Sequence, residues 1–301
     1  MMKRIAVLRW NKLPSFVTWD IPNTDELLAE DHLVLEGFNV HGFEAVSVVW
    51  NESNIDWNEF DIALIRSTWD YIDEAPRFLD VLSQIEASSC RLFNPLNAVR
   101  WNIDKNYLFD LERAGAPIVP TYLTSNSTPI ALQEMFIAKK WNTAILKPTL
   151  GGGGANSYKV ASVEINSTLQ NLKDRKPEQD YLIQPFIESV RTEGEWSFIF
   201  FNRKLSHVLL KKPAPNDYRV QGIYGGTVEI VEPQPPDLRQ AEAILAALPF
   251  DLLYARLDLV RVDGVLSVME VELIEPILSF NLVPEGVERF VNAVKDSLTK
   301  A

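Results

Sequence analysis

The segment from Leu253 to Pro276 constrains the fold more than any other part of the chain. It contains two runs rich in leucine and β-branched residues on either side of Asp263-Gly264, a dipeptide typical of tight turns. This pattern predicts a β-hairpin. Since the side chains of a strand alternate between its two faces, the pairing register decides which polar residues of the hairpin share a face.

Two turn lengths fit this sequence, and they produce different faces. A two-residue turn sets Asp258 opposite Met269 and mixes polar with apolar side chains on both faces. A three-residue loop sets Asp258 opposite Val268 and separates an apolar face from a polar one. We expect the three-residue loop. The polar face then carries three carboxylates, those of Asp258, Glu270 and Glu272.

Three carboxylates on one face repel one another, so a cation has to neutralise them. Oxygen ligands without His or Cys suit Mg²⁺ or Mn²⁺, with phosphate oxygens completing the coordination shell. The alternative is a solvated polar face on which Arg256 is the local counter-ion. The hairpin by itself is compatible with both interpretations, and Arg256 is also a candidate substrate residue.

The balance of charge limits the partners of the chain. Its 29 basic and 41 acidic residues give a net charge of −12, which argues against a general nucleic-acid binder and against binding to anionic membranes. A phosphate-binding role must therefore depend on a few well-placed cations. The single cysteine, Cys90, excludes an intrachain disulfide framework and a thiolate metal site.

The apolar segments are too short for a membrane protein. No stretch of about 18 consecutive apolar residues is present, so no membrane-spanning helix is expected. Residues 1–10 look like a first strand and are too short and too polar for a signal peptide. We therefore expect a cytoplasmic protein with more than one domain. The oligomeric state stays open, with a homodimer as one alternative.

The N-terminal third of the chain alternates between strands and helices, which predicts a parallel sheet covered on both faces. Ligands of such sheets bind beyond the carboxyl ends of the strands. Arg66, Trp69 and Asp70 follow the apolar strand Ile62 to Ile65, so we expect them to contact a small polar substrate. The alternative is a loop packed by its own aromatic side chains. No GxGxxG motif follows the first strand, so nothing supports a nicotinamide cofactor.

A run of four glycines, Gly151-Gly152-Gly153-Gly154, follows the strand that ends in Lys147-Pro148. Consecutive glycines let backbone amides turn toward an anion and let a loop close over phosphates. The run is not a Walker A loop, because no Gly-Lys-Ser or Gly-Lys-Thr ends it. Alone it is compatible with a mobile turn, but Lys147 is placed to reach an α- or β-phosphate.

Two further segments suit the rest of a nucleotide. Gln184, Phe186 and Ile187 end a strand at a predicted domain junction, where backbone groups would hydrogen-bond a base held between aliphatic side chains. Glu195 begins the next strand and would accept hydrogen bonds from both ribose hydroxyls. None of these features alone is specific for nucleotide binding. Their order along the chain, however, is specific.

This ordered set resembles the ATP-grasp superfamily over nearly the whole chain. The resemblance implies an α/β and α+β architecture with a Rossmann-like N-terminal domain over residues 1–98. A linker helix and a small lid subdomain would follow over residues 99–187, and a C-terminal subdomain with the metal site over residues 188–301. The two α+β subdomains would grip ATP between them.

The resemblance also implies a role for each candidate residue. Lys105 matches the first nucleotide lysine and would be catalytic. Asp217-Tyr218-Arg219 with Gly225-Gly226 resembles the segment whose arginine faces the γ-phosphate in glutathione synthetase and ribosomal-protein glutamate ligases. The other matches are Lys147 for the second lysine, Gly151, Gly152, Gly153 and Gly154 for the phosphate loop, Phe186 and Ile187 beside Gln184 for adenine, Glu195 for ribose, and Asp258, Glu270 and Glu272 for the metal. Glu272 departs from the family pattern, which usually has Asn there.

Several segments are similar to a narrower group, the cycloserine-biosynthesis cyclo-ligases and their relatives. They are IRSTWDY, NPLNAVRWNIDKNYL, IQPFIESVRTEGEWSF, LSHVLLKKPAPNDYRVQGIYGG and MEVELIEP. This resemblance implies a ligase that uses ATP with Mg²⁺ or Mn²⁺ to activate a small-molecule carboxylate as an acyl phosphate. An amine or similar nucleophile, in the same or a second molecule, then displaces phosphate.

Two other functions stay open on the sequence. One is a small-molecule kinase that stops at the phosphorylated product, and the other is an ATP-binding regulatory module without ligase activity. The full set of cations and carboxylates argues against the module, because nucleotide binding alone needs fewer of them.

Overall fold

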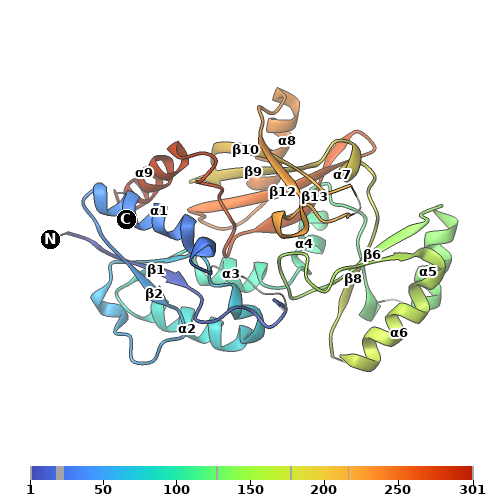
Figure 1. Ribbon diagram of the computed structural model, residues 1–301, viewed down its shortest axis with the longest axis horizontal. Coiled ribbons are helices and arrows are strands. Elements are labelled where there is room, and N and C mark those ends of the chain that lie inside the picture. Colours follow the sequence, from blue (N-terminus) through green and yellow to red (C-terminus); the bar gives the residue numbers. More distant parts are fainter. Residues whose placement is uncertain (1, 18–23, 127, 177, 216, 300–301) are drawn as a thin grey trace.

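The computed structural model describes residues 2–17, 24–126, 128–176, 178–215 and 217–299. Three β-sheets organise these residues: an N-terminal sheet, a small sheet and a large sheet, in that order along the chain. In Figure 1 the N-terminal and small sheets lie at opposite ends of the molecule, with the large sheet between and above them. None of the helices within these ranges combines the length and the apolar character needed to cross a bilayer.

The N-terminal sheet is parallel, which confirms the prediction from the strand–helix alternation. It consists of β1 (Arg4–Arg9), β2 (Glu44–Val49), β3 (Ile62–Ile65) and β4 (Arg91–Phe93) with helices α1 (Ala29–Val40) and α2 (Ala75–Ala87). The strand order is β2-β1-β3-β4. Ile5 and Val7 of β1 pack with α1, whereas Ala6 and Leu8 pack with α2, so the two helices cover opposite faces.

One continuous helix is predicted after this sheet, from Pro95 to Gly115, but two form. They are α3 (Leu96–Asn102) and α4 (Tyr107–Arg113). Between them the carboxylate of Asp104 accepts a hydrogen bond from the backbone N–H of Asn106 at 2.9 Å, a local turn that competes with helix formation. The backbone N–H of Lys105 donates to the carbonyl of Thr149 at 2.9 Å. The break therefore fixes Lys105 next to the start of the glycine run.

The small sheet is antiparallel, with the order β5-β8-β6-β7. Its elements are β5 (Tyr122–Leu123), α5 (Pro129–Ala138), β6 (Thr143–Pro148), β7 (Tyr158–Ala161), α6 (Ile165–Arg175) and β8 (Tyr181–Pro185). Both helices bury apolar side chains against the sheet, among them Phe136 of α5 and Leu169 of α6. The glycine run connects β6 to β7 and lies at the side of the sheet that faces the rest of the molecule.

The large sheet has the order β11-β10-β9-β12-β13. Its elements are α7 (Ser189–Thr192), β9 (Glu195–Phe201), β10 (Lys204–Lys212), β11 (Thr227–Ile230), α8 (Pro235–Ala246), β12 (Tyr254–Val262), β13 (Val265–Glu272) and α9 (Glu285–Thr299). In Figure 1 α9 lies beside α1, and the two helices share a core that includes Phe38 and Phe290. The sequence pattern does not predict β11, because three of its four residues are exposed at the sheet edge.

The turn of the β12–β13 hairpin differs from the predicted one. The three-residue loop is wrong: Asp263 and Gly264 alone form the turn, and Val262 pairs directly with Val265. Both turn residues have positive φ, 49° for Asp263 and 85° for Gly264, as a type I′ turn requires. Glycine adopts such angles without strain, and aspartate tolerates them better than most residues.

A β-bulge at Met269 restores the polar face that a two-residue turn alone would break. The pairing shifts by one residue next to Asp258, which lies opposite Glu270 and not opposite Val268. Glu272 lies two residues beyond Glu270 on the same strand and therefore on the same face. The three carboxylates thus share a face, as expected, although the pairing that led to this expectation was incorrect.

Two buried asparagines attach the hairpin to the N-terminal part of the chain. The side-chain amide of Asn94 donates to the carbonyls of Tyr254 and Leu273, both at 2.8 Å. That of Asn102 donates to the carbonyl of Val271 at 2.7 Å and accepts from the N–H of Leu273 at 2.8 Å. These bonds hold in place the end of β13 from which the carboxylates project.

Candidate active site

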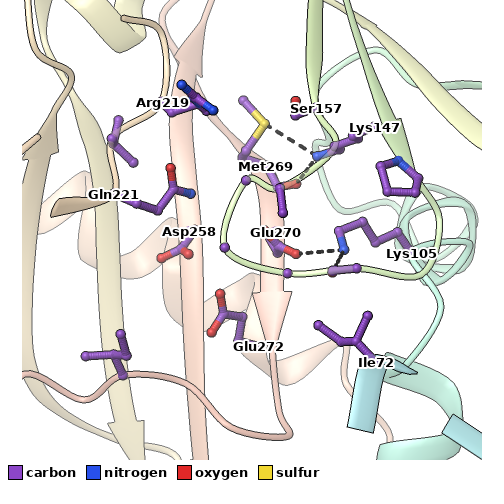
Figure 2. A pocket seen from close by; sticks show the side chains of 18 of the residues that line it. Ile72, Lys105, Lys147, Ser157, Arg219, Gln221, Asp258, Met269, Glu270 and Glu272 are labelled. Carbon is purple, nitrogen blue, oxygen red and sulfur yellow. Dashed lines mark hydrogen bonds and ion pairs between the residues drawn. The ribbon is translucent and has the colours of Figure 1, made fainter. Parts of the chain in front are cut away.

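A cavity of about 360 Å³ is lined by residues from the small sheet, from the large sheet and from segments that connect the strands of the N-terminal sheet. Figure 2 shows part of its wall, including the three carboxylates of the hairpin and the two lysines that face them. Sixteen of the candidate residues named from the sequence line this cavity: Trp69, Lys105, Lys147, Gly151, Gly152, Gly153, Gly154, Gln184, Phe186, Ile187, Glu195, Arg219, Arg256, Asp258, Glu270 and Glu272.

Arg66 and Asp70, two of the candidate substrate residues, do not line the cavity. Arg66 is only 3% exposed and forms an ion pair with Glu30 at 2.6 Å. Asp70 accepts hydrogen bonds from the indole N–H of Trp50 at 2.6 Å and from the backbone N–H of Asn11 at 2.9 Å. Both side chains thus stabilise the loop after β3. Of the three candidates in this loop, Trp69 is the one that lines the cavity.

The cavity wall formed by the small sheet has the groups that a nucleotide base requires. The backbone N–H of Phe186 donates to the carbonyl of Thr143 at 3.0 Å. This bond extends the pairing of β6 with β8 to the residue that follows β8. The side chain of Gln184 donates to the hydroxyl of Thr121 at 2.9 Å. Its carbonyl oxygen is buried and has no hydrogen-bond partner within the described part of the chain. An unpaired buried acceptor at this position fits an exocyclic amino group of a base.

Two lysines converge between this wall and the hairpin (Figure 2). The ammonium of Lys105 contacts the carbonyl of Gly151 and lies 3.3 Å from the carboxylate of Glu270. The ammonium of Lys147 lies 3.4 Å from the backbone carbonyl of Met269, the bulged residue. The bulge therefore brings the backbone toward Lys147 and also returns the carboxylates to one face.

The glycine run passes close to two other segments of the chain, one that contains Ile72 and one that contains Gln221. Gly153 and Gly154 have φ of 61° and 69°, a left-handed conformation that other residues rarely adopt. A Cβ on Gly152 would lie 3.3 Å from Ile72, in the segment after β3, and one on Gly154 would lie 3.1 Å from the side chain of Gln221. The run thus covers the space between Lys105 and the loop after β10 without side chains of its own.

The pKa of Lys147 is lowered to about 8, chiefly because burial disfavours its charged form. Below that pH the ammonium attracts phosphate, whereas above it the neutral amine does not. We therefore expect the affinity for ATP to fall as the pH rises from about 7 to about 9, by at most about tenfold per unit above the pKa. Isothermal titration calorimetry in two buffers of different ionisation enthalpy measures the accompanying proton uptake.

Lys147→Arg is the matched control for this titration. A guanidinium stays charged over this range, so the variant should bind ATP with little pH dependence, although more weakly, because its planar fork does not replace a compact ammonium. An unchanged pH dependence in Lys147→Arg would assign the titration to another group.

Arg219 is held in a fixed orientation by its neighbours Asp217 and Tyr224. Its guanidinium donates to both carboxylate oxygens of Asp217, at 3.0 and 2.8 Å, and stacks 3.4 Å from the centre of the Tyr224 ring. The hydrogen bonds from Arg219 lower the pKa of the Asp217 carboxyl to about 2, so the pair stays ionised at neutral pH. This cation is therefore preorganised at the cavity wall.

Cations also neutralise the carboxylate face of the hairpin. Arg256 contacts both Asp258, at 2.9 Å, and Glu272, and Lys211 lies 3.2 Å from Asp258. Burial alone would raise the pKa of Asp258, but Arg256 and Lys211 hold it well below its usual range. Burial raises the pKa of Glu272, whose ion-pair partner is Arg256. Asp258 is thus the more firmly ionised of the two.

The donor set of this face fits Mg²⁺, because Asp258, Glu270 and Glu272 offer carboxylate oxygens and no nitrogen or sulfur. Within the described ranges, however, no three potential ligands are already close enough to hold a metal ion. Arg256 and Lys105 currently pair with these carboxylates. A metal would therefore have to displace part of these ion pairs.

Charged cavity residues that were not identified as candidates from the sequence include Lys211 and Glu275. Lys211 lies 3.1 Å from Glu195 and directly opposite it in the β9–β10 pairing. The pairing shifts by one residue between Leu205 and His207, so counting residues from the hairpin turn would have placed Leu210 opposite Glu195 instead. Glu275 lines the cavity from a segment outside any strand. Periodicity gives no signal for such residues.

The chain is similar in sequence and in fold to several known proteins. Residues 5–94 match the family model described as "D-cycloserine synthetase DcsG, N-terminal domain". The cycloserine biosynthesis protein DcsG of Streptomyces lavendulae is 29% identical over 287 residues, covering 88% of this chain and 92% of the relative. The crystal structure of D-cycloserine synthetase DcsG superposes with a TM-score of 0.82 at 25% identity, covering 98% of this chain and 99% of the other.

A more distant neighbour shows how widely the fold is shared. The D-alanine–D-alanine ligase of Bacillus anthracis, solved with ATP, has a TM-score of 0.65 at 18% identity, covering 98% of this chain and 96% of that one. The chain has the ATP-grasp fold. Its relatives identify it as a ligase that forms carbon–nitrogen bonds. Within that class it is similar to the cycloserine synthetases, which confirms the resemblance inferred from the sequence.

Proposed function

We propose that the chain activates a small-molecule carboxylate as an acyl phosphate at the expense of ATP, and that an amine or similar nucleophile then displaces phosphate. The observation that supports this reaction is the composition of a single cavity. It combines the preorganised Arg219 and the lysines Lys105 and Lys147 with three carboxylates on one face. The only cysteine, Cys90, is buried elsewhere, so a covalent thiol intermediate is no part of the proposal.

Each group has a place along the nucleotide. Gln184, Phe186 and Ile187 would contact the base, Glu195 the ribose, and Lys105 and Lys147 the phosphates, with the glycine run covering them. Asp258, Glu270 and Glu272 would hold Mg²⁺ or Mn²⁺, which neutralises charge on the β- and γ-phosphates. Arg219 would contact the γ-phosphate, where negative charge spreads during transfer. Trp69 and Arg256 would contact the substrate.

The protein itself mainly positions the reactants and excludes water. A carboxylate oxygen of the substrate attacks the γ-phosphorus, the bond to the β,γ-bridging oxygen breaks, and ADP leaves. The nucleophile then attacks the acyl carbon, loses a proton and expels inorganic phosphate. No side-chain nucleophile is required, because alignment supplies most of the rate enhancement.

The acyl phosphate can be intercepted, and this tests the proposal. With ATP, Mg²⁺ and an accepted carboxylate, added hydroxylamine should yield a hydroxamate even when the natural nucleophile is missing, and the nucleotide product should be ADP. Coupled assays for ADP and colorimetric detection of the hydroxamate measure both products.

Other products would lead to other conclusions. AMP and pyrophosphate would rule out attack on the γ-phosphorus. ADP with a stable phosphorylated product and no hydroxamate would favour the small-molecule kinase. A control without the carboxylate substrate should show only background ADP.

A further inference from the structure

β13 is the last strand of the large sheet, yet its outer edge has hydrogen-bond partners along its length. An edge strand presents backbone N–H and C=O groups on its open side, and such groups are costly when they are buried without a partner. The partners here are single side chains and the short segment 117–119, and not a further strand. Their positions show which residues of β13 face outward.

On the turn side of the bulge at Met269, even-numbered residues face outward. The backbone N–H and carbonyl of Leu266 bond to the side chain of Gln240, at 3.2 and 2.7 Å. The N–H of Val268 donates to the carbonyl of Pro117 at 2.8 Å. Since alternate residues of a strand direct their backbone groups to opposite edges, this half of β13 has one consistent register.

Beyond the bulge, odd-numbered residues face outward instead. The N–H of Val271 donates to the hydroxyl of Tyr107 at 2.9 Å. The side-chain amide of Asn102 bonds to the carbonyl of Val271 and to the N–H of Leu273, as described above. The extra residue of the bulge has therefore exchanged the outward-facing set, and the two glutamates of β13 pair with β12.

The hydroxyl of Tyr107 fits the bulged register only. Without the bulge, Val271 would turn its N–H toward β12, and Met269 and Val271 would take the places of the two glutamates on the face of Asp258. Val271 is only 1% exposed, so water cannot readily replace the hydroxyl as the acceptor of its N–H. The bond therefore stabilises the register in which the glutamates share a face with Asp258.

Tyr107 also belongs to the segment that carries Lys105. It is the first residue of α4 and is buried, with its ring packed against that of Trp101 at 4.9 Å between centroids. Lys105 lies two residues earlier, and its ammonium is 3.3 Å from the carboxylate of Glu270 (Figure 2). One short segment thus fixes a cation of the cavity and also the strand that carries two of its carboxylates.

We propose that Tyr107 and Asn102 are positioning residues for the divalent metal. Their side chains hold β13 in its bulged register and so keep its two glutamates beside Asp258 on one face of the hairpin. This inference rests on the proposed function, in which those carboxylates bind the metal, and it adds two residues that are not metal ligands. Groups that orient metal ligands affect metal affinity almost as strongly as the ligands do. The effect passes through the backbone of Val271, which lies between the two glutamates.

Tyr107→Phe tests this role because it removes only the hydroxyl. With a non-hydrolysable ATP analogue present, we expect the dissociation constant of Mn²⁺, measured by electron paramagnetic resonance, to rise about tenfold. The amide of Val271 should also exchange its hydrogen faster, as followed by NMR or mass spectrometry. A purely structural residue would lower the melting temperature without changing the affinity for Mn²⁺.

Gln240→Leu is the matched control, since it removes side-chain partners from the same edge on the turn side of the bulge. It should lower the melting temperature but leave the affinity for Mn²⁺ unchanged. If Tyr107→Phe also binds Mn²⁺ like the wild type, or if both variants lose affinity equally, the inference is refuted while the metal site stands. If the wild type does not bind Mn²⁺ together with the analogue, the proposed metal site fails, and the inference fails with it.

Two further measurements decide the matter if Tyr107→Phe does not fold. Asn102→Leu keeps the hydroxyl of Tyr107 but removes the amide, and it should also weaken Mn²⁺ binding about tenfold. In the wild type, the amide of Val271 should exchange as slowly as the amides of the interior strand β12. Rapid exchange at Val271, or an unchanged affinity for Mn²⁺ in Asn102→Leu, would overturn the inference.

Discussion

Replacing Arg219 with alanine is expected to lower kcat about a thousandfold while changing the affinity for ATP little. The guanidinium is held by two hydrogen bonds to Asp217 and by the Tyr224 ring, so it is already oriented before the γ-phosphate arrives. A fixed cation at this position stabilises charge that develops in the transition state more than charge present in the ground state. The loss should therefore appear in kcat.

Lys147→Ala is the matched comparison for Arg219→Ala. It also removes a cation, but one that we expect to contact the phosphates nearer the ribose, so its loss should weaken ATP binding. Its ammonium lies beside the backbone of Met269, on the nucleotide side of the cavity, and we expect its removal to raise the KM for ATP with a smaller change in kcat. Steady-state kinetics, together with direct measurement of ATP affinity, separates the two effects. Equal loss of ATP affinity in both variants would contradict this division of roles.

Asp217→Asn tests the preorganisation itself. It leaves Arg219 in place but replaces an ionised acceptor by a neutral amide, so the guanidinium is held less firmly. We expect a decrease in kcat that is intermediate between the wild type and Arg219→Ala. A kcat equal to that of the wild type would show that Asp217 does not position Arg219.

Local patterns explain why much of the fold could be predicted. The bounds of β3, Ile62–Ile65, agree with the predicted strand, because the apolar pattern within this short segment is enough to specify it. The parallel N-terminal sheet follows from the alternation of such segments. The glycine run and Lys147 were recognised for a similar reason, since both lie within one short stretch of sequence.

Contacts between distant segments decide what could not be predicted. The bulge at Met269 changes the pairing halfway along the hairpin, and no feature of the turn sequence indicates it. Arg66 follows a strand end as a substrate-binding residue would, yet its partner Glu30 comes from another helix and draws it away from the cavity. Lys105 leaves the predicted helix because the carbonyl of Thr149 accepts its N–H. Each outcome depends on a partner remote in sequence.

The ion pairs between Arg256 and the carboxylates of the β12–β13 hairpin lead to the second prediction, a large loss of stability when Arg256 is removed. Arg256 is 8% exposed and contacts Asp258 and Glu272, so Arg256→Ala leaves two mostly buried carboxylates with less compensation. Removing one partner of a buried ion pair typically costs about 3–5 kcal/mol. We therefore expect a loss of this size in the free energy of unfolding, measured by denaturant titration in the presence of a chelator.

The same variant should respond to Mg²⁺ more strongly than the wild type. In the wild type Arg256 competes with a metal for Asp258 and Glu272, and Mg²⁺ without nucleotide should change stability little. Without the guanidinium the face keeps its negative charge, so Mg²⁺ or Mn²⁺ should restore part of the lost stability in a concentration-dependent way.

Arg261→Ala is the appropriate control for this prediction. Arg261 also pairs with two carboxylates, those of Glu193 and Asp237, both at 3.0 Å, but these side chains do not line the cavity. Its loss should destabilise the protein less, because the site is more exposed, and Mg²⁺ should not restore it. If Mg²⁺ instead stabilises the wild type and Arg256→Ala equally, the guanidinium does not compete for this face. The carboxylates would then have to bind the metal without releasing Arg256, and its contact with them would be structural in every state of the enzyme.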